Sequence, residues 1–186
     1  MNKDINVIYF HGYGSSSATD KAVGLRTFFE EVSAPDIPLL WDEADAYLKE
    51  YVSQALRAGA GKTFVFVGTS LGGYWATRMS DLFAVPSVII NPSCRPAVTL
   101  KSYANPLLTA SELSKFVALE PKSISARTVL LALDDEILDP KEAMDVFKFS
   151  DVKLFQNGGH RFSSINIIRD NIIETANFDY LSDDNI

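Results

Sequence analysis

The 186-residue chain is 47% hydrophobic and 22% charged, with a formal net charge of −7. This length fits one domain, 1–186, whose core needs no disulfide or metal in order to fold. The one cysteine, Cys94, excludes an intramolecular disulfide, and the acidic balance argues against nucleic acid as a partner, because phosphate backbones bind basic surfaces. No apolar run has the length of a membrane span or the form of a signal peptide, so we expect a cytoplasmic protein.

Short apolar segments alternate with amphipathic ones along the chain. Strands are predicted, in chain order, at 5–10, 36–40, 63–67, 87–90, 128–133 and 152–155. Helices are predicted at 19–32, 42–58, 71–82, 140–147 and 165–176. This alternation indicates a parallel sheet that helices cover on both faces. In such a sheet, ligands bind beyond the carboxyl ends of the strands.

The segment 91–125 interrupts the alternation. It contains prolines at positions 92, 96, 106 and 121 and one predicted helix at 110–119. A long connection at the active end of a sheet is typical of a cap or a binding loop, and a plain surface connection is the alternative. We expect 91–125 to be a small cap-like insertion within the single domain.

A Gly-x-Ser-x-Gly pattern, Gly68 to Gly72, lies between a predicted strand and a predicted helix. In this setting the serine occupies a sharp turn that lifts its hydroxyl above the sheet edge, and small flanking residues let the strand and the helix approach closely. The pattern predicts Ser70 as a nucleophile. It also places the backbone N–H of Leu71 at a helix start, where it can stabilise an oxyanion.

A nucleophilic serine needs a base within hydrogen-bonding distance. The chain has two histidines, His11 and His160. When the nucleophile lies on a turn of this type, the order along the chain is serine, then acid, then histidine, which selects His160.

The acid that orients the histidine is expected after the fifth strand, where Asp134, Asp135 and Asp139 lie. We predict Asp135 and keep Asp134 as the open alternative. Asp139 precedes Pro140 and is a candidate helix cap.

The first strand ends in His11-Gly12-Tyr13. A loop of this form supplies a second oxyanion donor from the backbone N–H of the residue after the glycine, here Tyr13. We expect His11 to fix this loop rather than to act as a second base. The candidate substrate contacts are His11, Ser15, Asn91, Arg95 and Arg161.

These features resemble the α/β-hydrolase superfamily and, more narrowly, the small bacterial esterases of the YqiA/YcfP-like (UPF0227-like) family. The similarity spans nearly the whole chain, and its blocks lie at 9–16, 68–74, 90–96, 135–139 and 159–162. The more specific blocks are Asn-Pro-x-x-Arg-Pro and Gly-His-Arg-Phe. One departure is Asp134, where the family tends to have glycine.

The resemblance implies a minimal α/β-hydrolase core of about six mainly parallel strands in the order 2-1-3-4-5-6. It also implies that Ser70, Asp135 and His160 form a triad that hydrolyses a small-molecule carboxylic ester or acyl thioester through an acyl-enzyme, without a metal or organic cofactor. Two alternatives remain: acyl transfer at the same site, and a non-catalytic ligand-binding protein on the same fold.

Overall fold

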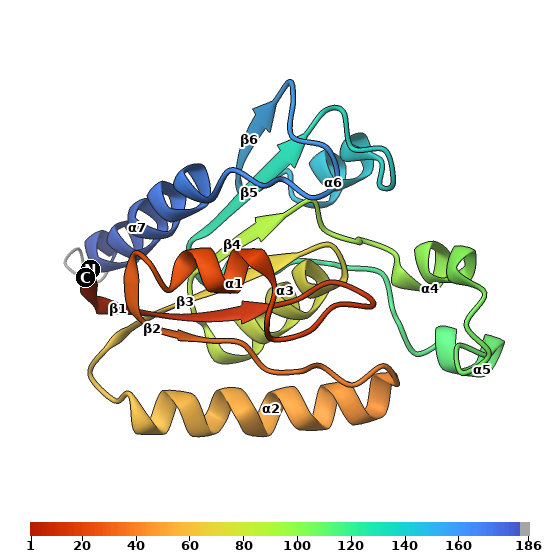
Figure 1. Ribbon diagram of the computed structural model, residues 1–186, viewed down its shortest axis with the longest axis horizontal. Helices are drawn as coiled ribbons and strands as arrows, with labels where there is room; N and C mark the ends of the chain where they lie inside the picture. The colour runs from red at the N-terminus through yellow and green to blue at the C-terminus, as the bar shows by residue number, and fades with distance from the viewer. Residues whose placement is uncertain (183–186) are drawn as a thin grey trace.

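The computed structural model describes residues 1–182 of the chain (Figure 1). Its six-stranded sheet has the order β2-β1-β3-β4-β5-β6, and every neighbouring pair is parallel. The strands are β1 (Asn2–Phe10), β2 (Phe29–Ser33), β3 (Thr63–Thr69), β4 (Ser87–Ile90), β5 (Arg127–Ala132) and β6 (Asp151–Phe155). The predicted strand order and direction are confirmed, although a different segment from the expected one forms the second strand.

Helices cover both faces of this sheet, as predicted. Helices α2, α3 and α6 pack on one face, and α1 and α7 pack on the other. The helices are α1 (Asp20–Leu25), α2 (Trp41–Ala58), α3 (Leu71–Phe83), α4 (Pro96–Thr99), α5 (Ala110–Leu113), α6 (Pro140–Val146) and α7 (Ile165–Ser182), with a 3₁₀ turn at Leu100–Tyr103.

Strand β1 shows how a continuously apolar segment builds two cores. Ile8 and Phe10 belong to the core beneath α2 and α3, whereas Val7 and Tyr9 belong to the core beneath α1 and α7. Successive side chains of a strand point to opposite faces, so an apolar strand must be covered twice. Each large side chain buried in this way stabilises the fold by roughly 1.5–3 kcal/mol.

The expectation of a helix over 19–32 is wrong. Helix α1 ends at Leu25, and the chain then forms the edge strand β2 against β1. In the turn between them, the Phe28 N–H donates to the Leu25 carbonyl oxygen (2.9 Å). The apolar spacing of this segment is helical, but pairing with the free edge of β1 satisfies a row of backbone groups and overrides that local preference.

The expectation of a strand over 36–40 is also wrong, because this stretch is a loop that leads into α2. Its Ile37 N–H donates to Nε2 of His11 (3.0 Å) instead of to a strand. Pro38 has no N–H and so cannot donate to a ladder. The edge of β1 is already occupied by β2.

The segment 91–125 extends beyond the carboxyl edge of the sheet, at the right of Figure 1, where α4 and α5 are labelled. The helix expected at 110–119 is shortened to α5, because the chain turns after Leu113. Further on, the Leu119 N–H donates to the Cys94 carbonyl oxygen (2.9 Å). Helix α4 has no counterpart in the prediction; it begins with Pro96, at a position where proline loses no hydrogen bond.

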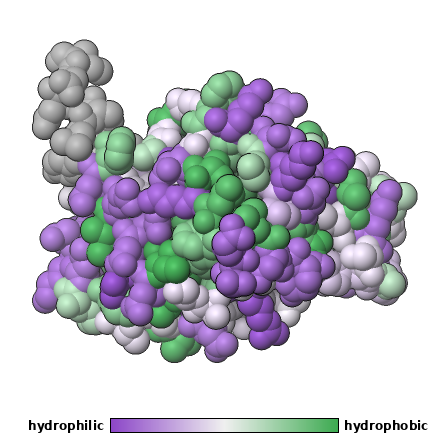
Figure 2. Space-filling view, turned by 90° about the horizontal axis from the view of Figure 1, so that it is seen from above, coloured by the Kyte–Doolittle hydropathy of each residue, from purple (hydrophilic) through white to green (hydrophobic). Residues whose placement is uncertain are grey.

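Figure 2 looks onto the side of the molecule on which β6 lies in Figure 1. Hydrophobic residues on this side form patches among hydrophilic ones. Phe149, just before β6, and Leu154, within it, are large hydrophobic side chains that are exposed. Within residues 1–182, no helix is both long enough and apolar enough to cross a membrane.

Candidate active site

The residues predicted for the site come together at the carboxyl edge of the sheet. Ser70 follows β3, Asp135 follows β5 and His160 follows β6. A cleft of about 660 Å³ opens at this edge. Residues that line it include Tyr13, Ser15, Ser70, Tyr103, His160 and Arg161.

Ser70 occupies the turn between β3 and α3 with φ 58° and ψ −122°. A positive φ strains a residue that has a Cβ atom, typically by about 1–3 kcal/mol. Backbone contacts hold the turn in place: the Ser70 N–H donates to the Ile90 carbonyl oxygen (3.0 Å), and the Ser93 N–H donates to the Ser70 carbonyl oxygen (3.0 Å). The turn therefore presents Ser70 to the cleft from a fixed backbone.

The two glycines of the Gly-x-Ser-x-Gly pattern lie where the backbone leaves no room for a Cβ atom. A Cβ atom on Gly68 would lie 2.2 Å from the Gly72 carbonyl oxygen, and one on Gly72 would lie 2.0 Å from the Phe10 carbonyl oxygen. Both distances are far below van der Waals contact. Helix α3 can therefore begin this close to β3 and β1 only when both positions lack a side chain.

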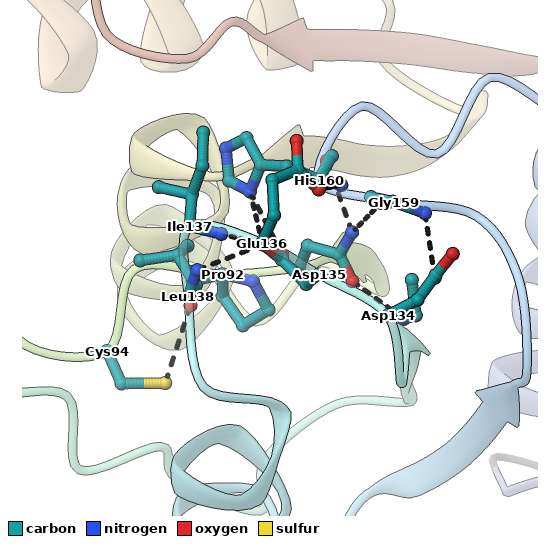
Figure 3. Close-up of polar contacts among 11 residues, drawn as sticks. Pro92, Cys94, Asp134, Asp135, Glu136, Ile137, Leu138, Gly159 and His160 are labelled. Carbon is teal, nitrogen blue, oxygen red and sulfur yellow. Dashed lines mark hydrogen bonds and ion pairs between the residues drawn. The ribbon is translucent and has the colours of Figure 1, made fainter.

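His160 is bound to Asp135 through its ring (Figure 3): Nδ1 lies 2.9 Å from Oδ2 and 3.1 Å from Oδ1. The exposed fractions of the two side chains are 13% and 2%. Oδ1 of Asp135 also accepts hydrogen bonds from the N–H groups of Ile137 (2.8 Å) and Leu138 (2.9 Å).

These contacts determine the charge of Asp135. Burial alone would raise the pKa of Asp135, but the hydrogen bonds from His160 and from the Leu138 and Ile137 backbone together lower it below its usual value. The ionised carboxylate accepts from Nδ1–H of the ring, so Nε2 is the ring nitrogen that does not contact Asp135.

The acids on either side of Asp135 hold the backbone of the His160 loop. Oδ1 of Asp134 accepts from the Gly159 N–H (2.8 Å), and Oε2 of Glu136 accepts from the His160 N–H (2.9 Å). The Gly159 contact lowers the pKa of Asp134. Of the two aspartates that the sequence leaves open, Asp135 contacts the ring and Asp134 contacts the loop backbone.

Asn91, a candidate substrate contact in the sequence, binds the same loop. Its Nδ2 donates to the carbonyl oxygens of Gly159 (2.9 Å) and His160 (3.1 Å), and its Oδ1 accepts from the Ala132 N–H (2.9 Å). The residue is 2% exposed. Its amide therefore supports the loop that presents His160 and faces protein rather than the cleft.

His11 fixes the loop that follows β1. Its Nε2 accepts from the Ile37 N–H (3.0 Å), and its Nδ1 donates to the Gly12 carbonyl oxygen (2.9 Å). Both ring nitrogens thus bind backbone, as expected for a residue that is not a second base. Gly12 packs directly on the nucleophile turn, because a Cβ atom on it would lie 3.4 Å from the Ser70 Cβ.

Tyr13 connects this loop to the segment 91–125. The centroid of its ring lies 4.4 Å from that of Tyr103, and Nδ2 of Asn105 donates to its hydroxyl (3.0 Å). A second cavity of about 240 Å³ shares residues 12–15 with the cleft. Its apolar lining includes Leu39, Leu71 and Trp75.

The remaining candidate residues divide into two groups. Ser15 and Arg161 line the cleft. Arg95 is ion-paired with Glu142 and does not belong to the cleft lining. Cys94 is buried, and burial raises the pKa of its thiol to about 12, so the thiol stays protonated.

Ser70 and His160 border one cleft, but within residues 1–182 no hydrogen bond joins their side chains. Catalytic hydrogen bonds are often long without substrate and shorten when it binds. Sequence reasoning did not assign the loop contacts of Glu136 and Asn91. The run of three acids at 134–136 and the Asn-Pro block were the available signals.

Comparison with known proteins agrees with this architecture. Residues 6–176 match the model described as "Uncharacterised protein family (UPF0227)". A UPF0227 protein of Vibrio cholerae serotype O1 is 27% identical over 168 residues, which cover 86% of this chain and 92% of the relative.

Two solved structures are similar in fold. Alpha/beta hydrolase domain-containing protein 10 from mouse has a TM-score of 0.62 and 19% identity, over 91% of this chain and 90% of that one. An esterase of Pyrococcus furiosus has a TM-score of 0.66 and 19% identity, over 91% and 77%. The fold is therefore that of an α/β hydrolase, and because the family model spans most of the sequence, the chain belongs to the UPF0227 family.

Proposed function

We propose that this protein is a serine hydrolase that cleaves carboxylic esters or acyl thioesters, with Ser70 as nucleophile, His160 as base and Asp135 as the orienting acid. The observation that supports this most directly is that Ser70, on its strained turn, borders the same cleft as an Asp135-bound His160. The Pyrococcus furiosus neighbour, which shares the fold, is described as an esterase.

Acylation proceeds in two proton transfers. Ser70 Oγ attacks the acyl carbonyl carbon while Nε2 of His160 takes the hydroxyl proton. The bond from the carbonyl carbon to the leaving oxygen or sulfur then breaks, and His160 gives that proton to the departing alcohol or thiol. The ionised Asp135 stabilises the imidazolium between these transfers.

Deacylation repeats the sequence with water. His160 takes a proton from water, the resulting hydroxide equivalent attacks the acyl-enzyme, and the proton returns to Ser70 as the acid leaves. One water molecule is consumed for each ester bond cleaved.

The backbone N–H groups of Leu71 and Tyr13 are the proposed oxyanion donors. Leu71 is the first residue of α3, so its N–H has no acceptor within the helix. Tyr13 follows Gly12, which packs against Ser70. Two such donors aimed at the developing negative charge lower the barrier more than the same groups in water, because they are already oriented.

The segment 91–125 acts as a cap in this proposal, within one catalytic domain formed by the whole chain. Tyr103 lines the cleft, and its ring packs on Tyr13, whose hydroxyl accepts from Asn105. A movement of the cap would therefore also move the loop at Tyr13, which supplies a proposed oxyanion donor.

The proposal is tested with p-nitrophenyl butyrate and with the butyryl thioester of N-acetylcysteamine. Wild-type protein should hydrolyse at least one of them, and Ser70→Ala should lower kcat by at least about 10³. Ser123→Ala, an exposed serine away from the cleft, is the matched control and should keep wild-type rates. Adding methanol as an acceptor separates acyl transfer from hydrolysis through the products.

A well-folded wild-type protein that hydrolyses neither substrate, or a Ser70→Ala variant as active as wild type, would contradict the proposal. Circular dichroism of each variant establishes that its fold is intact.

A further inference from the structure

Lys21 is partly buried and is ion-paired with no carboxylate among the side chains of residues 1–178. The other lysines and arginines that are partly or fully buried each lie within ion-pair distance of a carboxylate: Arg78, Lys115, Arg127, Lys153 and Arg169. Among the side chains that the structure describes, Lys21 is the exception. A shielded cation ordinarily has a partner, because desolvating an unpaired charge is costly.

Lys21 lies at the candidate active site. Lys21 lies in the first turn of α1 and lines the cleft that contains Ser70 and His160. Arg161, the residue directly after His160, lines the same cleft. Among the side chains of residues 1–178, no carboxylate is ion-paired with Arg161 either.

The two cations lie close enough to affect one another. Burial lowers the pKa of Lys21, the charge of Arg161 lowers it further, and Asp20 acts in the opposite direction. Asp20 also lines the cleft, so its lining contains one aspartate, one lysine and one arginine, beside His160. Among the charged side chains that line the cleft, lysine and arginine therefore outnumber carboxylates by two to one, in a chain whose net charge is −7.

An anion bound between the two cations would remove their repulsion and supply the missing partner. A guanidinium offers a planar pair of donors that matches a carboxylate or a phosphate, and an ammonium adds a compact charge beside it. Such binding would be favourable at this point of the surface even though the protein as a whole repels anions, because local charge outweighs distant charge at short range.

We propose that Lys21 and Arg161 form an anion subsite of the Ser70 cleft, and that the substrate is an ester or thioester bearing a carboxylate or phosphate group. The inference rests on the proposed function, since it assigns a substrate class to the same site. It adds Lys21, which has no role in the chemistry of the triad.

The kinetic test compares esters that differ in charge. One set has the charge in the acyl half: the p-nitrophenyl esters of pimelate, of 6-phosphonohexanoate and of monomethyl pimelate, the last being neutral. A second set has it in the leaving half: 4-carboxyphenyl butyrate against 4-carbamoylphenyl butyrate. The quantity measured is the ratio of kcat/KM for each anionic ester to kcat/KM for its neutral counterpart.

Lys21→Met and Arg161→Gln should each lower this ratio, in at least one set, by about tenfold, as expected for loss of one partly screened charge contact. Lys62→Met, which removes an exposed lysine far from the cleft, should leave the ratio unchanged. The carboxylate and phosphonate members show which anion the subsite prefers. A ratio that stays constant in both cleft variants, in both sets, overturns the inference while leaving the proposed function intact.

A binding experiment keeps the inference testable without turnover. Ser70→Ala protein is titrated calorimetrically with monoethyl pimelate, ethyl 6-phosphonohexanoate, diethyl pimelate, 4-carboxyphenyl butyrate and 4-carbamoylphenyl butyrate. At least one anion should bind more tightly than its neutral counterpart, and adding Lys21→Met should weaken it about tenfold. Equal binding of anionic and neutral compounds, or binding that Lys21→Met does not change, overturns the subsite even if no ester is hydrolysed.

Discussion

Oδ2 of Asp135 lies 2.9 Å from Nδ1 of His160, and the acids before and after Asp135 accept hydrogen bonds from the backbone of the same histidine loop. Three consecutive carboxylates therefore hold one loop at three different points. Because one of them contacts the ring and two contact the main chain, their removal should have different consequences.

Asp135→Asn should lower kcat for p-nitrophenyl butyrate by about 10³–10⁴, because an amide at this position favours the wrong tautomer of His160. Asp134→Asn retains an acceptor oxygen for the Gly159 N–H. It should therefore lower kcat by less than about tenfold, since only the charge on a loop contact is lost. Equal losses in the two variants would contradict the assignment of Asp135 as the acid.

The lowered pKa of Asp135 predicts how stability depends on pH. A carboxyl group whose folded-state pKa lies below its unfolded value stabilises the fold above the unfolded pKa of about 3.9, and this contribution is lost as the pH falls through the folded value. The Tm difference between wild type and Asp135→Asn should therefore be largest near neutral pH and should narrow below about pH 4. A difference that grows with acidification would mean that the folded-state pKa of Asp135 is raised instead.

Asn91→Ala should weaken both the fold and the presentation of His160. The substitution leaves the partly buried carbonyl oxygens of the histidine loop and the buried Ala132 N–H without this partner, at a cost of up to about 1–3 kcal/mol for each group left unsatisfied. Urea unfolding should show the loss, and kcat should fall more than KM rises. Asn166→Ala, on the exposed face of α7, is the control and should change neither.

Gly72→Ala should prevent normal folding, because the added Cβ would lie 2.0 Å from the Phe10 carbonyl oxygen and both are parts of packed elements. Gly14→Ala is the matched comparison: its φ is 67°, but no atom lies within 4 Å of the added Cβ. It should cost only the backbone strain of about 1–2 kcal/mol. Similar soluble yields and Tm values for the two variants would show that the close approach at Gly72 can relax.

The parts of the fold that could be predicted from the sequence are those where local pattern and tertiary position agree. In strand β5, for example, residues 129–132 are apolar and buried on both faces, so their pattern agrees with their position in the sheet. The segment Phe29–Ser33 was predicted to be helical because its apolar spacing is that of a helix. Its strand conformation depends on pairing with β1, which lies far from it in the sequence. Local pattern does not contain that information.

The candidate site shows the same division. Ser70 and His160 are marked by short motifs that reflect local turns, so they could be selected before the structure was known. The roles of Asn91 and Glu136 depend on contacts across 24 to 69 positions. Lys21 and Arg161, which line the same cleft, are 140 positions apart in the sequence. Such relationships arise from the order of the strands, which brings separate loops to one edge of the sheet.

The central claim is that Ser70 is an activated nucleophile, and labelling with a fluorophosphonate probe tests it most directly. Wild-type protein should gain one adduct, which peptide mass spectrometry places on Ser70, and neither Ser70→Ala nor a well-folded Asp135→Asn variant should be labelled at the wild-type rate. Failure of the folded wild-type protein to react, or labelling that persists at another residue in Ser70→Ala, would contradict the account.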